Sequence, residues 1–98
     1  MESVSVKAQV TLKDVEVKLE DMELLKAICN RIKIPTRFLT EDYKVEDNKI
    51  WYLEDIDTHK SEYEWIPKDY DQEWVDKVVL VRTIAATMGY TRIMSHQI

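Results

Sequence analysis

The fold is organised around residues 69–98, which read DYDQEWVDKVVLVRTIAATMGYTRIMSHQI. Asp69 comes two residues after Pro67, and Gln72 comes three residues after Asp69, which is the spacing of a capping box at the start of a helix. Gly89, the only glycine of the chain, suits the left-handed position at which helices end. Between these signals apolar residues recur every three or four positions on one helical face, namely Trp74, Val78, Val81, Ala85 and Met88. We therefore predict a helix over residues 69–88.

This helix is apolar on more than one side. Val75, Val79, Leu80 and Ile84 widen the apolar surface, so the helix is expected to be buried on two sides or to pack against a second copy of the chain. A competing interpretation is a short buried strand over residues 77–82, because Val-Val-Leu-Val is rich in β-formers. The helix is favoured because cap, periodicity and glycine agree.

Length and composition indicate one soluble globular domain, residues 1–98. Hydrophobic residues make up 45% of the chain, and there are only one glycine and two prolines, which excludes a disordered or low-complexity class. No apolar run reaches the roughly 20 residues that span a bilayer, and the start of the chain has no signal-peptide pattern. The lone Cys29 cannot form an internal disulfide. We therefore expect a cytoplasmic protein without a signal peptide.

Charge is concentrated in the middle of the chain. Residues 41–76 carry thirteen acidic side chains and four lysines, a net charge of −9, whereas the whole chain has a net charge of −5. Such a segment repels the phosphates of nucleic acids and anionic membrane surfaces. We therefore expect neither as a direct partner.

The first nineteen residues allow two interpretations. Apolar and polar residues alternate over Val4, Val6, Ala8, Val10 and Leu12, the pattern of a strand with one buried face. After Lys13-Asp14 the alternation shifts by one position to Val15, Val17 and Leu19. The segment is therefore either a hairpin of two strands or one long strand with a bulge.

A second helix is predicted between Asp21 and Pro35. Asp21 can cap its start, and Pro35 cannot continue a helix. Its apolar residues are Leu24, Leu25, Ile28 and Ile32. Cys29 lies beside them, without a histidine near it in sequence, so we interpret it as a structural thiol in or near the core.

Four further strands complete the predicted pattern. Residues 37–45 and 49–56 are expected to form a hairpin across Glu46-Asp47-Asn48. The second of these strands is apolar on both faces, so it is either a central strand or one whose second face is covered by a loop or a partner. Residues 62–66 resemble an edge strand, and residues 90–98 a last strand.

The resulting order of strand, helix, strand, strand, helix, strand is the split βαβ layout and is similar in outline to ferredoxin-like domains. We therefore predict an α+β fold with an antiparallel sheet of four to five strands and two helices on one face. A layout shared with ferredoxin-like domains transfers no activity, because that fold carries many unrelated functions.

Five possible metal ligands cluster near the middle of the chain: Asp55, Asp57, His59, Glu62 and Glu64. Carboxylates and histidine can hold a divalent ion, but the calcium-loop pattern is absent, and a solvated acidic loop is the simpler interpretation. The two histidines are accompanied by no phosphate-binding loop or nucleophile motif. We therefore predict no enzyme activity and no cofactor, and keep a metal-dependent enzyme or metal sensor as an alternative.

Aromatic residues are interleaved with the same acids. Proteins that stack bases on aromatic rings combine them with Lys and Arg, whereas here the neighbours are acidic, which argues against nucleic acid. Trp51 and Trp74 are expected in the core, and exposed members of the group would suit a protein interface. The group comprises Trp51, Tyr52, Tyr63, Trp65, Tyr70 and Trp74.

These observations favour a small protein-binding domain, regulatory or inhibitory, that presents an acidic and aromatic face to a basic protein. Its partner can be a nucleic-acid enzyme whose groove it occupies in competition with nucleic acid. An alternative is a homodimeric accessory subunit that pairs through the helix at 69–88. The predicted partner-binding residues are Glu54, Asp55, Asp57, Glu62, Tyr63, Glu64, Trp65, Asp69, Tyr70 and Asp71.

Overall fold

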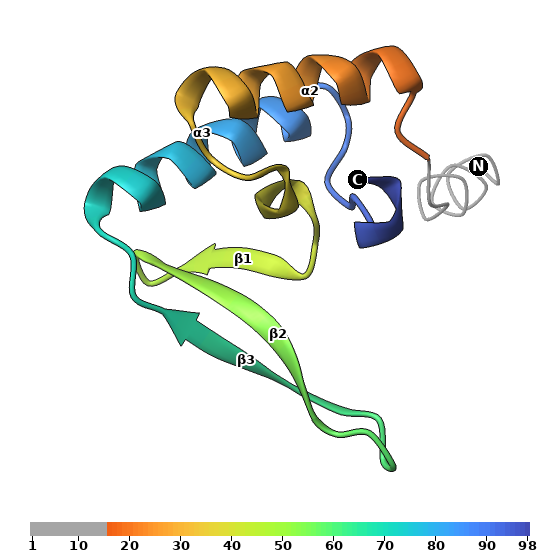
Figure 1. Ribbon diagram of the computed structural model, residues 1–98, viewed down its shortest axis with the longest axis vertical. Helices are drawn as coiled ribbons and strands as arrows, with labels where there is room; N and C mark the ends of the chain where they lie inside the picture. The colour runs from red at the N-terminus through yellow and green to blue at the C-terminus, as the bar shows by residue number, and fades with distance from the viewer. Residues whose placement is uncertain (1–15) are drawn as a thin grey trace, which may run out of the picture.

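The computed structural model describes residues 16–98, which form a helical layer above a three-stranded antiparallel sheet (Figure 1). The α+β class is therefore confirmed, whereas the strand predicted over Val4–Leu12 lies outside the described residues. The elements are α2 (Leu19–Ile32), the 3₁₀ helix η1 (Thr36–Leu39), β1 (Tyr43–Glu46), β2 (Lys49–Asp57), β3 (Glu62–Lys68), α3 (Gln72–Thr87) and the 3₁₀ helix η2 (Ser95–Gln97).

The sheet has the strand order β1-β2-β3, so the prediction of β2 as the central strand is confirmed. β1 and β2 pair from Tyr43 opposite Tyr52 to Glu46 opposite Lys49. Asp47 and Asn48 form the connecting turn with φ angles of 52° and 59°. Two positive φ values are typical of the tight hairpin turn that matches strand twist, and Asp and Asn tolerate them. The predicted hairpin is thus correct, as is the edge strand β3, which extends to Lys68.

Residues 37–42 are not a strand as predicted, because Phe38 and Leu39 are both buried. A strand sends consecutive side chains to opposite faces, whereas the 3₁₀ turn of η1 directs both toward the core. Arg82 stabilises this turn, since its Nη1 donates hydrogen bonds to the carbonyls of Phe38 (3.0 Å) and Thr40 (2.5 Å).

The predicted last strand over residues 90–98 is also wrong. Tyr90 and Ile93 are buried, but the segment follows an irregular path that ends in η2. The Glu41 amide donates to the Ile93 carbonyl at 2.8 Å, which ties the segment to the chain ahead of β1. The described residues thus contain three strands, and neither four to five strands nor the ferredoxin-like layout is confirmed.

α3 confirms the helix in residues 69–88 and excludes a strand over residues 77–82. Its N-cap is Asp71 and not Asp69, and the Asp71 carboxylate accepts a hydrogen bond from the Trp74 amide at 3.1 Å. Gln72 completes no capping box; its side chain instead bonds to Asn48 and Asp76. Gly89, with a φ of 99°, follows the last turn as expected.

α2 begins earlier than predicted, at Leu19, with Lys18 as its N-cap. Asp21 therefore lies in the first turn, where its carboxylate accepts a hydrogen bond from the Tyr90 hydroxyl. That hydrogen bond raises the pKa of Tyr90. Leu24 is 51% exposed, and Met22 takes its place in the core. In residues 16–98 no helix is both long and apolar enough to cross a membrane.

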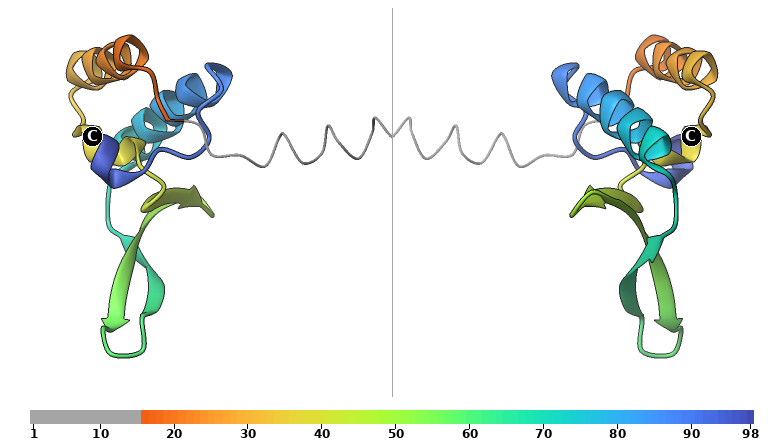
Figure 2. Two further views of the ribbon diagram at one scale, coloured as in Figure 1. Left: turned by 90° about the vertical axis from the view of Figure 1, so that its right-hand side faces the viewer. Right: turned by 90° about the vertical axis from the view of Figure 1, so that its left-hand side faces the viewer.

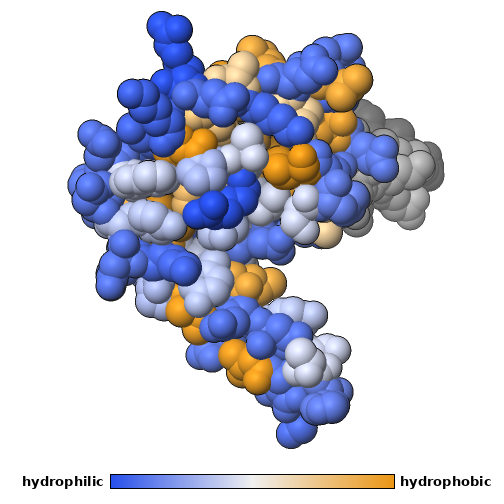
Figure 3. All heavy atoms as spheres, in the orientation of Figure 1, coloured by the Kyte–Doolittle hydropathy of each residue, from blue (hydrophilic) through white to orange (hydrophobic). Residues whose placement is uncertain are grey.

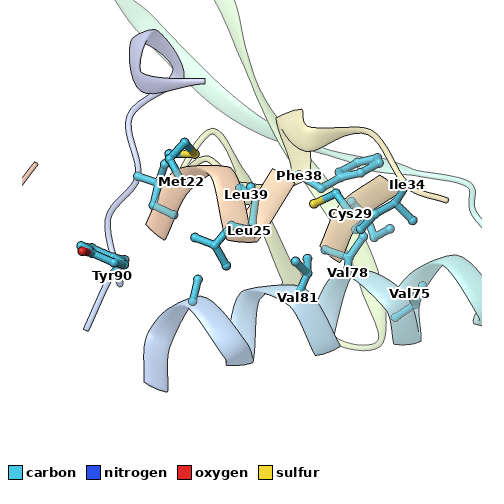
Figure 4. Packing of buried hydrophobic residues seen from close by; sticks show 13 residues of the cluster. Met22, Leu25, Cys29, Ile34, Phe38, Leu39, Val75, Val78, Val81 and Tyr90 are labelled. Atoms are coloured by element: carbon cyan, nitrogen blue, oxygen red, sulfur yellow. The ribbon is translucent and has the colours of Figure 1, made fainter. Parts of the chain in front are cut away.

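The hydrophobic core lies between α2, α3 and η1 (Figure 4). Phe38 is at its centre and contacts the rings of Tyr43, Tyr70 and Trp74 edge-on, at centroid distances of 5.0, 5.7 and 6.0 Å. Cys29 is fully buried, as predicted for a structural thiol, and burial raises its pKa to about 11. α3 and η1 contact β1, and α2 packs on α3 and η1, so both helices lie on one side of the sheet (Figure 2).

Candidate functional site: the β2–β3 arm

β2 and β3 extend away from the helices as a two-stranded ribbon, which we call the arm (residues 49–68; Figures 1 and 3). Ile50 is the only residue of the arm that belongs to the hydrophobic core. The remaining side chains of the arm therefore contribute to its surface on both faces. Seven of the ten predicted partner-binding residues lie on it.

The register of the arm brings acidic side chains into direct opposition near its tip. Glu54 lies opposite Glu64, and Asp57 lies opposite Glu62 after a bulge between Asp55 and Asp57. Within residues 54–64 there are five acids and a single lysine, so the tip is strongly acidic. Like charges directly opposite each other destabilise a sheet, and nothing in the core compensates for this cost at the tip.

Two acids of the tip also order its loop. The Asp57 carboxylate accepts hydrogen bonds from the amides of His59 (3.0 Å) and Lys60 (3.3 Å). The Asp55 carboxylate accepts one from the Asp57 amide at 3.2 Å. The part of the chain that the structure describes contains no group of three His, Cys, Asp or Glu side chains that can hold a metal ion. Asp55 and Asp57, two of the five possible ligands, therefore serve to order the acidic loop.

The face of the arm turned away from the core is apolar. Leu53 pairs with Trp65, and Trp51 pairs with Pro67, so these side chains share one face of the ribbon. Trp51, Leu53 and Trp65 are half-buried and lie outside the core. The prediction that Trp51 belongs to the core is therefore wrong: its indole N–H donates to the Glu46 carbonyl at 2.9 Å on the surface of the sheet.

Two lysines lie over aromatic rings near the root of the arm. The ammonium of Lys44 lies 4.5 Å from the ring centre of Trp65 and forms a 2.8 Å ion pair with Glu46. On the opposite face, the ammonium of Lys68 lies 4.4 Å from the ring centre of Tyr52. These cation–π contacts hold the rings in place. The arm thus has a basic and aromatic root and an acidic tip.

The other three predicted residues lie between β3 and α3, and two of them have structural roles. Tyr70 is half-buried against Phe38 and Trp74, with a centroid distance of 5.3 Å to Trp74. Asp71 caps α3. Asp69 is exposed beside them. The predicted surface is thus divided into the arm and a short connector.

Sequence reasoning missed Leu53 on the outer face of the arm and Lys44 of β1, whose ammonium lies over Trp65 on that face. Apolar residues on both faces of β2 were the available signal, but this pattern equally fits a strand covered on both sides. Comparisons of the chain with protein-family models, with curated proteins and with solved structures found no match.

Proposed function

We propose that the protein is a small protein-binding domain that uses the arm to engage a partner with a basic surface. The observation that supports this proposal is the pair of directly opposed acids, Glu54 with Glu64 and Asp57 with Glu62, on a ribbon outside the core. Opposed acids cost stability in the free protein. A cationic surface that meets the tip relieves this repulsion on binding, and the acids also speed encounter with such a surface.

Affinity comes from the outer aromatic face. Trp51 and Trp65 are large, half-buried and held by contacts with Glu46 and Lys44. Tryptophan is enriched among the residues that dominate binding energy at protein interfaces, and rings already fixed in place lose little conformational entropy on binding. The arm therefore combines electrostatic steering at its tip with preorganised apolar contacts nearer its root.

The protein acts in the cytoplasm as a regulator or inhibitor in this proposal. A two-stranded ribbon with an acidic tip carries the charge of a nucleic-acid backbone and is narrow enough to enter a basic groove, since neighbouring strands lie about 4.8 Å apart. The arm then competes with nucleic acid for the groove of a nucleic-acid enzyme. Addition of single-stranded or duplex DNA should displace the protein from such an enzyme.

Affinity co-purification with the tagged full chain tests the proposal. The bait is incubated with a nuclease-treated extract of the source cells and eluted with a salt gradient. We expect basic proteins to elute as salt rises, because screening weakens contacts between exposed charges. The variant Glu54→Gln/Glu64→Gln should release them at lower salt.

A matched control has the same loss of charge on α2. Glu20→Gln/Glu23→Gln removes two exposed acids from the first turns of that helix, far from the arm in sequence. Its elution should equal that of the unmodified bait. If the arm variant elutes with the unmodified bait as well, the acidic tip does not bind the partner and the proposal fails.

A homodimer that forms through α3 is a second candidate function. Val79 is 43% exposed and Leu80 is 50% exposed, so this helix presents apolar side chains to solvent. Light scattering over a range of concentrations tests the dimer. A mass that rises with concentration in the unmodified chain, and stays monomeric in Leu80→Glu, supports the dimer. A concentration-independent monomer removes it.

A further inference from the structure

A groove runs along α3 on the side of β1. One part of it, with a volume of about 420 Å³, is lined by Lys44, Val45, Val79, Arg82, Thr83 and Ala86. A second cavity of about 220 Å³ shares Arg82 and Ala86 with the first and continues to Tyr90 and Thr91. The two cavities adjoin at Arg82 and Ala86, and we call them together the groove; its lining residues run from Val79 of α3 to Thr91 of the C-terminal segment. Val45, Val79 and Ala86 give it an apolar strip, beside which lie Lys44, Arg82 and Thr83.

β1 borders this groove with a backbone edge. It is an edge strand, paired with β2 only among the described strands. Glu46 and Lys49 flank the two-residue turn, so they exchange hydrogen bonds with each other, and the next such pair is Lys44 with Trp51. The amide and carbonyl of Val45 therefore point away from β2. Such an edge is a template for an added strand.

The N-terminal residues join the described structure at the other end of the groove. The Lys18 amide donates to the Tyr90 hydroxyl at 3.4 Å, and Tyr90 lines the groove. Val17, the preceding residue, packs against the core. The fifteen residues before Glu16 therefore start beside the groove. In extended form fifteen residues reach about 50 Å, whereas the helical stretch from Val79 to Tyr90 is about 16 Å long.

We propose that residues 4–12 of the same chain occupy this groove as a fourth strand added to the edge of β1. Their apolar side chains, Val4, Val6, Ala8, Val10 and Leu12, alternate with polar ones, as a strand with one covered face requires. The apolar face covers Val45, Val79 and Ala86, and the polar face meets water. Residues 4–12 carry one charge, that of Lys7, which belongs to the polar side of the alternation and therefore does not face Val45, Val79 and Ala86.

The covalent link favours this occupant over a separate peptide. A short tether gives an effective concentration in the range of about a millimolar, which a partner present at lower concentration does not reach. The added strand also protects the edge of β1 from pairing with other chains. The groove then serves to complete the sheet, and the arm remains free for a partner.

Paramagnetic broadening in the full chain tests the proposal. A nitroxide is attached at Gln9→Cys, on the polar side of the segment; Cys29 is fully buried and its pKa is raised to about 11, so the reagent does not label it. We expect loss of amide signal intensity at Val45, Val79 and Thr83. The same label at Thr58→Cys, in the loop at the tip of the arm, should leave these three signals intact.

Substitutions on the two faces of the segment separate docking from mere proximity. In the labelled protein, Val10→Lys should restore the three signals, because it places a charge on the covered face. Thr11→Lys makes the corresponding change on the polar face and should leave the broadening in place. If Gln9→Cys causes no broadening at these amides, or if Val10→Lys and Thr11→Lys behave alike, the proposal is wrong.

A mixed sample identifies which chain supplies the strand. Labelled protein without isotopic enrichment is mixed with unlabelled, ¹⁵N-enriched protein. The proposal predicts sharp signals in the mixture, since each groove is filled by its own chain. Broadening at Val45 and Val79 in the mixture means that a second copy supplies the strand, and this result overturns the intramolecular proposal.

Discussion

Asp71 and Asp69 are two residues apart, and only Asp71 accepts a hydrogen bond from the first turn of α3. The D-x-x-Q spacing favours Asp69 in the sequence, but a cap also needs an extended backbone immediately before the helix. Asp71 has this conformation, with φ of −72° and ψ of 171°. The residue that caps the helix is thus the one directly before its first turn, and this position is set by where the chain turns from β3 into α3.

Asp71→Ala should lower the free energy of unfolding by about 1 kcal/mol, because the Trp74 amide loses its acceptor. Urea denaturation monitored by circular dichroism measures the change. The matched control is Asp69→Ala, which removes an exposed acid outside the helix and should change stability by less than about 0.5 kcal/mol. An equal loss in both variants would mean that the cap does not stabilise α3 as the structure indicates.

Cys29 should make stability fall in alkaline solution. Burial raises its pKa from 9.0 to about 11, so the folded state keeps the thiol protonated at pH values where the unfolded state releases the proton. The resulting stability is fully present below pH 9 and is lost as pH rises from 9 toward 11. We expect a loss of roughly 1–2 kcal/mol over this window.

Urea titrations at several pH values, with a reducing agent present, measure this loss. Cys29→Ala should show a smaller decline between pH 9 and 11 than the unmodified protein, whatever its stability at neutral pH. Tyr90→Phe serves as a second reference, because the raised pKa of Tyr90 adds a loss of the same sign at higher pH. Parallel pH profiles for Cys29→Ala and the unmodified protein would contradict the assignment to this thiol.

At the scale of elements, the arm is distinguished by a strand register that places acidic side chains opposite each other. Glu54 faces Glu64 across β2 and β3, and both are exposed. Either Glu54→Lys or Glu64→Lys replaces this repulsion with an opposite-charge pair and should stabilise the fold by about 0.2–1 kcal/mol. Thermal or urea unfolding measures the gain.

The double variant is the control for this prediction. Glu54→Lys/Glu64→Lys restores a like-charge pair, now of two lysines, and should lose much of the gain of each single variant. Additive gains in the double variant would show that the two side chains do not interact. In the proposed function, each single variant should also weaken binding to the basic partner, so that stability and binding change in opposite directions.

Another element, η1, shows how a distant residue changes a local prediction. Residues 37–42 have a strand-like composition, but Arg82 of α3 donates to the carbonyls of Phe38 and Thr40 from more than forty positions away. Burial lowers the pKa of Arg82. These hydrogen bonds satisfy carbonyls that a strand would have paired in the sheet.

At the scale of the whole molecule, the helical layer and the arm differ in how many side chains they contribute to the hydrophobic core. The core gathers side chains from α2, η1, α3 and the C-terminal segment, whereas the arm supplies only Ile50 to it. Regions with few buried apolar contacts open locally at low free energy. Backbone amides in residues 54–64 should therefore exchange with deuterium faster than those of residues 75–85, as measured by NMR at neutral pH.

Residues 54–64 should still exchange faster than residues 75–85 when urea lowers the global stability slightly. The difference should disappear only when amides in both regions exchange through global unfolding. Asp71→Ala provides a useful comparison, because it destabilises the helical layer. It should therefore reduce the difference in amide exchange rate between residues 54–64 and residues 75–85. Equal protection of residues 54–64 and 75–85 in the unmodified protein would show that the arm is not an independent opening unit.

The sequence alone determined the elements whose signals are local. Apolar periodicity, with Pro35 and Gly89 as end signals, predicts the two helices, and polar turn residues between strand-like runs predict the β1–β2 hairpin and the edge strand β3. It also determined the acidic character of the central segment and the burial of Cys29. Each of these depends on residues within about one helical turn or one strand length.

Only the tertiary structure decided the rest, because the deciding contacts join residues far apart in sequence. Tyr90 is held by Asp21, and Ile93 by Glu41, so residues 90–98 do not join the sheet as a strand. The helical layer packs on the side of the sheet that carries Ile50, which places Trp51, on the opposite face of β2, outside the core. The register sets glutamate against glutamate on the arm. Local sequence patterns specify helices and strands. Which group each backbone amide and carbonyl bonds to, and which face of an element is buried, depends on how the elements pack together.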